Sequence, residues 1–206
     1  MNKIEIVKLW ERWKFLLPWS VIVNRIFTAP VLIWEAREGH PEILFLIAFS
    51  GAFFGDVFDG VIARFLKVSN AALRQGDSFA DVCLYSAVFW SAWRTFPQVI
   101  LEYKSPLLAL LCLQITLLVA GLLKYRRPVC YHTYSAKAWG LSIYIAAMCL
   151  FLTHQGGWSL WLMIGVGILH TLEETAITLI LPNWNYDVLS LFHALKLART
   201  TEASAE

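Results

Sequence analysis

Residues 56–81 read DVFDGVIARFLKVSNAALRQGDSFAD, and this stretch places four aspartates inside apolar sequence. The flanking segments 43–55 and 82–93 carry no charged residue, so an unneutralised carboxylate here costs several kcal/mol. Asp56 and Asp59 are three residues apart and therefore share one face of a helix. The same holds for Asp77 and Asp81, which are four apart. Two such pairs facing each other across a helical hairpin would form an all-oxygen site for hard divalent cations.

The composition predicts an all-α integral membrane protein. Hydrophobic residues make up 58% of the 206 residues, the mean hydropathy is +0.58, and there are ten tryptophans, which exceeds the apolar content of soluble domains. Pro41, Pro106, Pro182 and the pair Gly156–Gly157 separate segments of the length that a bilayer requires. The predicted six transmembrane helices cover residues 15–36, 43–66, 76–97, 106–124, 138–154 and 158–181.

Both ends of the chain predict amphipathic helices. In residues 1–14, apolar side chains alternate with charges near the helical period, which is typical of a helix lying on a membrane interface. The segment 185–206 is again amphipathic, and we expect it at the interface or packed on the helical hairpin. The predicted organisation is an interfacial helix (1–14), a six-helix domain (15–184) and a cytoplasmic tail (185–206).

The distribution of basic residues predicts the orientation in the membrane. Thirteen of the 17 Lys and Arg residues fall in the N-terminal arm, the loop between the aspartate pairs, the 124–137 connection or the tail. Because basic residues gather in cytoplasmic loops, both termini are predicted to be cytoplasmic. The charges follow the alternation of loops and form no continuous stripe, which argues against a nucleic acid partner.

The spacing in residues 56–81 resembles the signature of the CDP-alcohol phosphatidyltransferase family, D-x-x-D-G-x-x-A-R, seven or eight residues, then G-x-x-x-D-x-x-x-D. Leu73 stands where this pattern has a glycine, which is thought to lie against the nucleotide in the family. The resemblance implies a homodimer, and we expect the protein to lie in a bacterial inner membrane. The seven matching positions are Asp56, Asp59, Gly60, Ala63, Arg64, Asp77 and Asp81.

The resemblance also implies roles for these residues. Asp56, Asp59 and Asp77 would be the main ligands of two Mg²⁺ or Mn²⁺ ions. Asp81 would bind metal and also act as the catalytic base for an attacking hydroxyl. Two cations about 3.5–4 Å apart can neutralise a pyrophosphate and stabilise both the attacking and the leaving oxygen. Nucleotide contacts are implied for Asp56, Gly60, Ala63, Arg64 and Leu73.

A second basic group lies in residues 124–137, KYRRPVCYHTYSAK. The simplest interpretation is the bias of basic residues toward cytoplasmic loops. The alternative is a pocket for an anionic acceptor on the same side as the aspartates, with Lys137 as the main candidate. Glycerol 3-phosphate or inositol phosphate would use such a pocket, whereas inositol, serine or choline would not need it. Weaker candidates are Arg126, Arg127 and His132.

Polar residues inside the predicted spans suggest further partners. Glu173 and Glu174 interrupt the last span, and we expect one of them to support Lys137 or Arg25. The alternative is a solvated pair at the level of the interface. Arg25, in the first span, is predicted to be a polar support inside the bundle.

The resulting functional prediction is transfer of a phosphatidyl group from CDP-diacylglycerol to a small polar alcohol, with release of CMP. A divalent-cation carrier is a second possibility, but it would need polar residues across the bilayer, and segments 106–124 and 138–154 are almost purely apolar. A catalytically inactive scaffold is a third possibility, against which the intact aspartates argue.

Overall fold

The computed structural model describes the backbone of residues 3–38, 43–66 and 71–203, and the side chains of residues 19–37, 43–57 and 71–200. In that part of the chain every named element is a helix, in agreement with the all-α prediction. The chain forms two compact units, Met1–Phe96 and Pro97–Glu206. Each unit is described in turn.

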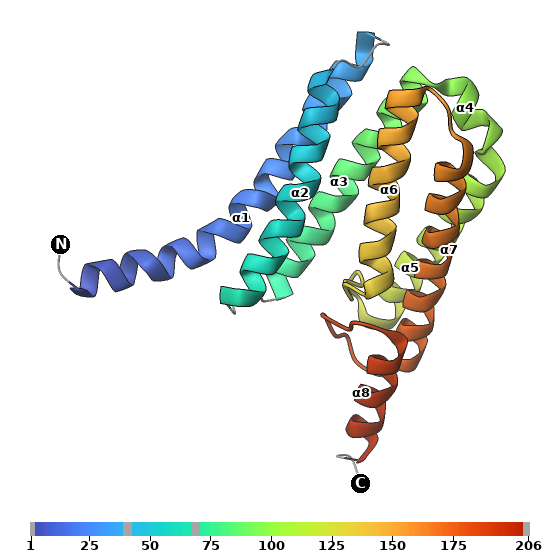
Figure 1. Ribbon diagram of the computed structural model, residues 1–206. Coiled ribbons are helices and arrows are strands. Elements are labelled where there is room, and N and C mark those ends of the chain that lie inside the picture. Colours follow the sequence, from blue (N-terminus) through green and yellow to red (C-terminus); the bar gives the residue numbers. More distant parts are fainter. Residues whose placement is uncertain (1–2, 39–42, 67–70, 204–206) are drawn as a thin grey trace. The chain divides into compact units, whose positions relative to one another are not determined.

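The first unit contains α1 (Lys3–Glu35), a short 3-10 helix η1 (Ala36–Glu38), α2 (Ile43–Leu66) and α3 (Ala71–Thr95). The helix α1 packs against both α2 and α3 (Figure 1). Ile22 of α1 forms a buried cluster with Leu73 and Ala80 of α3. Further along, the Ser91 hydroxyl of α3 donates to the backbone oxygen of Leu32, at 3.1 Å. These contacts tie α3 to α1 at two levels.

The predicted interfacial segment and the predicted first span belong to one continuous helix, Lys3–Glu35. Figure 1 shows that this helix bends along its length. It contains Pro18, and a proline inside a helix removes a backbone donor and favours such a bend. The boundary predicted at residue 14 is therefore not a helix end. The interfacial position of the N-terminal part stays a prediction.

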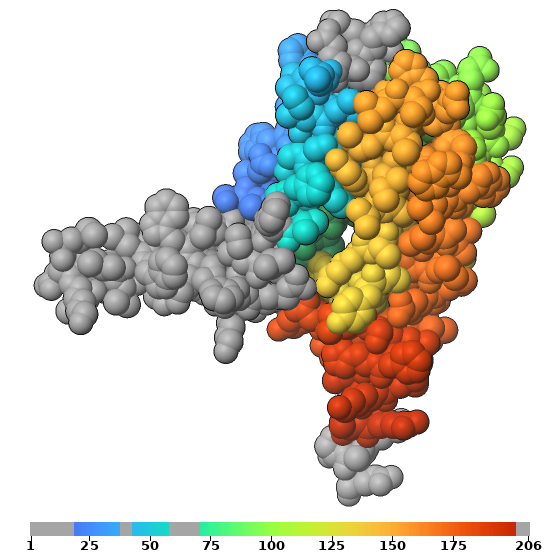
Figure 2. All heavy atoms as spheres, viewed as in Figure 1, coloured from blue at the N-terminus to red at the C-terminus, as the bar shows by residue number. Residues whose placement is uncertain are grey.

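The second unit contains α4 (Pro97–Glu102), α5 (Lys104–Tyr125), α6 (Tyr134–Thr153), α7 (Gly157–Ile180) and α8 (Leu191–Ala203). The helix α7 packs against α5, α6 and α8, and Figure 2 shows α6 and α7 in contact along one face. A buried apolar cluster contains residues from the 126–133 connection, from α7, from the chain that follows α7, and from α8. It therefore fixes α8 at the end of α7. Its members are Tyr131, Ile177, Leu181, Val188 and Ala194.

On either side of the 126–133 connection, a backbone cap ends α5 and a side-chain cap begins α6. Arg126, which follows α5, is its C-cap and is in the left-handed conformation, with φ 57°. Thr133, which precedes α6, is its N-cap, and its hydroxyl accepts a hydrogen bond from the Ala136 amide at 3.1 Å. The Lys124 ammonium donates to the backbone oxygens of Thr178 and Leu179, at 2.8 and 2.9 Å. Lys124 therefore satisfies carbonyl groups at the C-terminus of α7, which would otherwise have no partner in the helix.

Three helices among the described residues, α5, α6 and α7, are long and apolar enough to cross a membrane, and Ile43–Val57 is a shorter apolar stretch. The best window of α5 has a mean hydropathy of 2.4, yet only 17% of it is buried in the protein. Such an apolar outer surface suits lipid and not water. α3 differs because it carries Asp77 and Asp81 together with two arginines. The predicted count of six spans is therefore not confirmed within the described part of the chain.

Candidate active site

Three aspartates of the first unit converge on the guanidinium of Arg25. Asp56 comes from α2, Asp77 and Asp81 from α3, and Arg25 from α1. Arg25 Nη2 lies 3.0 Å from Asp56 Oδ1. The same nitrogen donates to Asp77 Oδ1, and Nη1 donates to Asp81 Oδ1. The structure thus brings together three of the four aspartates that the sequence singled out, and it adds a cation between them.

Arg25 is fully buried, whereas the three aspartates keep between 20% and 34% of their side-chain surface exposed. An isolated charge in apolar surroundings is very costly, so a buried guanidinium must be paired. Its Nε has no hydrogen-bond partner, which leaves the two Nη groups to carry the pairing. The sequence predicted Arg25 as a polar support inside the bundle, with one of the two glutamates as the partner of Lys137 or Arg25. Within the first unit, Arg25 forms ion pairs with aspartates of the helices that contact α1. The glutamate pairing stays a prediction.

Among the four side chains of this cluster, carboxylates outnumber the guanidinium by three to one. Asp59 lies in α2 almost one turn after Asp56, but its side chain is outside the described residues. Like charges held this close repel each other strongly in a poorly solvated setting. The cluster can therefore accept further cations.

The donor atoms fit a hard divalent cation, because Mg²⁺ and Mn²⁺ prefer carboxylate oxygens. In residues 19–37, 43–57 and 71–200, no group of three His, Cys, Asp or Glu has the geometry of a formed metal centre. The carboxylates are arranged around Arg25 instead. The residues that could hold a metal are Asp56, Asp77 and Asp81, with Asp59 as the fourth candidate. The metal prediction thus rests on the chemistry and charge of the donors.

Leu73, the one departure from the family signature, lies in the α1–α3 contact. Its side chain is 6% exposed and packs against Ile22 and Ala80. A bulky apolar residue at this position fills space between the two helices. Its contact with a nucleotide stays a prediction. Gly60, Ala63 and Arg64 lie in α2, and their side chains are outside the described residues.

The candidate acceptor residues are exposed residues of the second unit. Arg126 is the residue that ends α5, and the Arg127 guanidinium lies over the Trp184 ring, 5.6 Å from its centroid. Lys137 is in the first turn of α6, with its ammonium 5.2 Å from the centroid of the Tyr134 ring. Stacking on an aromatic ring holds a cation without neutralising it. The role of these residues in binding an acceptor stays a prediction.

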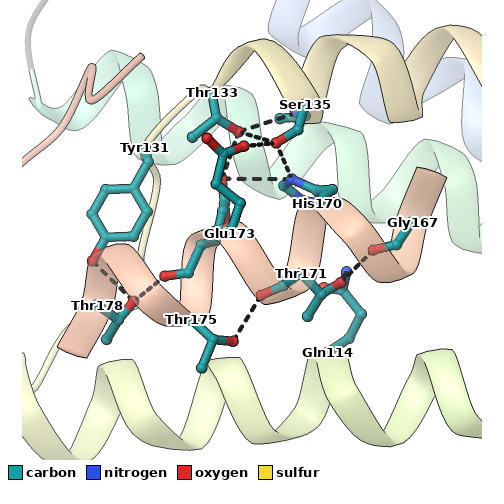
Figure 3. A network of polar contacts seen from close by, with 12 residues as sticks. Gln114, Tyr131, Thr133, Ser135, Gly167, His170, Thr171, Glu173, Thr175 and Thr178 are labelled. Atoms are coloured by element: carbon teal, nitrogen blue, oxygen red, sulfur yellow. Dashed lines mark hydrogen bonds and ion pairs between the residues drawn. The ribbon is translucent and has the colours of Figure 1, made fainter. Parts of the chain in front are cut away.

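A polar network at the α6–α7 contact was not predicted from the sequence (Figure 3). The Ser135 hydroxyl donates to Glu173 Oε2 and lies 3.3 Å from His170 Nδ1. The Thr133 hydroxyl donates to Glu174 Oε1 at 3.4 Å. The Glu-Glu pair and His170 were visible as polar residues in an apolar span. The hydroxyl groups gave no signal, because Ser and Thr are ordinary residues in any helix start.

The two glutamates have separate partners. Glu174 is 7% exposed and faces the Thr133 cap of α6. Glu173 accepts a hydrogen bond from the backbone amide of Leu191, the first residue of α8, at 3.0 Å. A carboxylate at a helix N-terminus satisfies an amide that lacks a partner in the helix and interacts favourably with the helix dipole. Glu173 therefore links α7 to the start of α8.

Long apolar helices and an acidic cluster paired with a buried arginine define a helical membrane protein with a carboxylate-rich site. The sequence profile of the CDP-alcohol phosphatidyltransferase family matches residues 15–170, and the chain belongs to this family. The protein is accordingly a membrane transferase of substituted phosphate groups that acts on a CDP-alcohol in phospholipid biosynthesis. No curated protein and no solved structure shows a significant match to the chain.

Proposed function

We propose that the protein transfers the phosphatidyl group of CDP-diacylglycerol to the hydroxyl of a small polar alcohol and releases CMP. The observation that carries this proposal is the convergence of Asp56, Asp77 and Asp81, contributed by two helices, within a chain of this family. Carboxylates that together outnumber the local cation suit a substrate whose pyrophosphate must be bound through divalent metal ions.

The proposed roles are those that the resemblance to the family implies. Asp56 and Asp77, with Asp59, would hold two Mg²⁺ or Mn²⁺ ions, which would neutralise the charge of the donor pyrophosphate. Asp81 accepts the proton of the attacking hydroxyl. The hydroxyl oxygen forms a bond to the phosphorus that carries diacylglycerol, and the bond from this phosphorus to the oxygen of CMP breaks. CMP leaves with that electron pair, so the phosphatidyl group changes partner without any redox step.

Glycerol 3-phosphate is the acceptor that we propose first, because its phosphate suits the exposed cations Lys137, Arg126 and Arg127. The stacking of Arg127 on Trp184 and of Lys137 on Tyr134 supports this choice, since it restricts both side chains and each keeps its positive charge. Inositol, inositol phosphate, serine and choline are the other acceptors to be compared. We further propose a homodimer with both termini in the cytoplasm.

The decisive experiment is incubation of detergent-purified protein with CDP-diacylglycerol, Mg²⁺ or Mn²⁺, and one alcohol at a time, with CMP release as the readout. We expect CMP with one alcohol well above the rate without alcohol. The matched control is Asp77→Asn, which keeps the size of the side chain and removes its charge. Failure of every alcohol with the intact chain, or equal release by Asp77→Asn, contradicts the proposal.

A further inference from the structure

Arg25 occupies the position between the helices that a cation would take if it had to neutralise three carboxylates at once. It is 0% exposed and makes ion pairs with Asp56, Asp77 and Asp81. We propose that Arg25 is a built-in counter-cation, which holds these carboxylates in their assembled arrangement before divalent cations bind and competes with those cations electrostatically. The competition with metal rests on the function proposed above.

The geometry of the contacts suits this role. Nη2 forms ion pairs with one aspartate of α2 and one of α3, and Nη1 forms an ion pair with a second aspartate of α3. A planar guanidinium can direct its donors to several carboxylates at once, which the single ammonium of a lysine does less well. An ionised carboxylate offers about four lone-pair sites on its two oxygens. An ion pair with Arg25 therefore does not exhaust the capacity of an aspartate to bind metal.

The neighbouring contacts keep the guanidinium in place. Ile22, almost one turn before Arg25, is packed against Leu73 and Ala80 of α3. Leu32, about two turns after Arg25, accepts the hydrogen bond of Ser91 from the same helix. α1 is thus attached to α3 on both sides of Arg25, so the position of its side chain is set by helix packing and not by the ion pairs alone.

The electrostatic consequence has a definite sign. A positive charge within reach of the metal ligands lowers their affinity for Mg²⁺ or Mn²⁺, because cations repel one another. The same charge stabilises the metal-free protein, because without it three neighbouring carboxylates lose their ion pairs with the guanidinium. Loss of Arg25 must therefore lower the stability of the metal-free protein and raise its affinity for metal, because Arg25 and the metal ions interact with the same carboxylates.

The first test is Mn²⁺ binding to detergent-purified protein, followed by electron paramagnetic resonance and independent of turnover. Arg25→Met keeps an unbranched side chain and removes the charge, and we expect it to bind Mn²⁺ at least about tenfold more tightly than the parent. Arg25→Lys keeps the charge and should bind Mn²⁺ close to the parent affinity. Equal or weaker binding by Arg25→Met overturns the proposed competition.

The second test uses the melting temperature in EDTA and involves no metal. Arg25→Met should lower the Tm by roughly 10 °C, since it removes the ion pairs of three partly buried carboxylates, and Arg25→Lys should lower it less. Adding Asp81→Asn to Arg25→Met should raise the Tm again, because it removes one repelling charge. An unchanged Tm for Arg25→Met, or a further fall in the double variant, overturns the counter-cation role.

The two tests separate this inference from the proposed function. If the parent protein binds no Mn²⁺, the metal-assisted reaction and the competition with metal both fail, and the Tm comparison in EDTA alone decides the counter-cation role. If the parent binds Mn²⁺ and releases CMP but Arg25→Met shows neither effect, the proposed function stands and the inference about Arg25 is wrong.

Discussion

The two units stabilise their carboxylates in opposite ways. In the first unit, three aspartates share one buried guanidinium. In the second unit, Glu173 and Glu174 accept hydrogen bonds from neutral groups, namely hydroxyls and a backbone amide. A carboxylate served by fixed neutral donors is already satisfied, whereas a crowded set of carboxylates around one cation still attracts cations. We therefore expect the aspartates of the first unit to take part in the chemistry and the two glutamates of the second unit to stabilise the fold.

The family match covers parts of both units. It spans residues 15–170, which includes Arg25 and all four aspartates, and it ends before Glu173. The link from Glu173 to α8 therefore lies outside the segment that defines the family. Each prediction below tests whether the two groups of carboxylates differ in function as they differ in partners.

Removal of metal should have the largest effect. Treatment with EDTA should abolish CMP release, because the carboxylates of the aspartate cluster then repel the donor pyrophosphate, and added Mg²⁺ or Mn²⁺ should restore it. Asp56→Asn, Asp59→Asn and Asp77→Asn should be inactive although they insert and extract normally. Glu174→Gln, as the matched change in the second unit, should retain metal-dependent activity. Full turnover after exhaustive chelation would rule out the metal-assisted mechanism.

Substitution of the proposed base should affect turnover more than binding. Asp81→Asn should lower kcat by about 10²- to 10⁴-fold, the range that a positioned base contributes. The KM for CDP-diacylglycerol should change little, because the other aspartates still hold the metal ions. The measurement is steady-state CMP release at varied donor concentration. If Asp81→Asn loses donor binding as severely as Asp56→Asn does, Asp81 is chiefly a metal ligand and the base lies elsewhere.

Leu73 tests whether the α1–α3 contact supports the acidic cluster. Leu73→Gly removes a buried side chain and introduces a flexible residue in a helix, and should cost about 3–5 kcal/mol of stability. We expect kcat/KM for the donor to stay the same or to fall. A chemical denaturation series gives the first quantity and CMP release the second. A large gain in kcat/KM would show instead that Leu73 obstructs the nucleotide.

The smallest effect is expected at Glu173. Glu173→Ala removes the acceptor of the Leu191 amide, and loss of a helix cap costs about 0.5–2 kcal/mol. Amide hydrogen exchange in the first turn of α8 should become faster, while metal-dependent CMP release continues. Glu173→Gln keeps an acceptor oxygen and should change exchange less. Unchanged exchange in Glu173→Ala would mean that α8 is held by its apolar contacts alone, and loss of activity would contradict the division between the units.

Several features of the fold were readable from periodicity and composition. The bounds predicted for the second span, 43–66, agree with α2, because a charge-free segment followed by the Gly- and Asp-containing motif has clear limits. α6 begins four residues earlier than the predicted 138, since Thr133 caps it from a segment that looked like a loop. The short helix α4 was missed because six residues are too few for a periodic pattern.

The sequence by itself singled out the four aspartates as one motif and determined the family to which the chain belongs. Fixed spacing on a helix and the high cost of charge in apolar segments are local properties, and they can be read without coordinates. Only the tertiary structure decided that Arg25 pairs with aspartates of α2 and α3 and that Leu73 fills the α1–α3 contact. It also decided that Glu173 accepts a hydrogen bond from the first residue of α8. Partners from helices distant in sequence depend on how those helices rotate and pack, and side-chain periodicity shows which face is apolar but not which neighbour it meets.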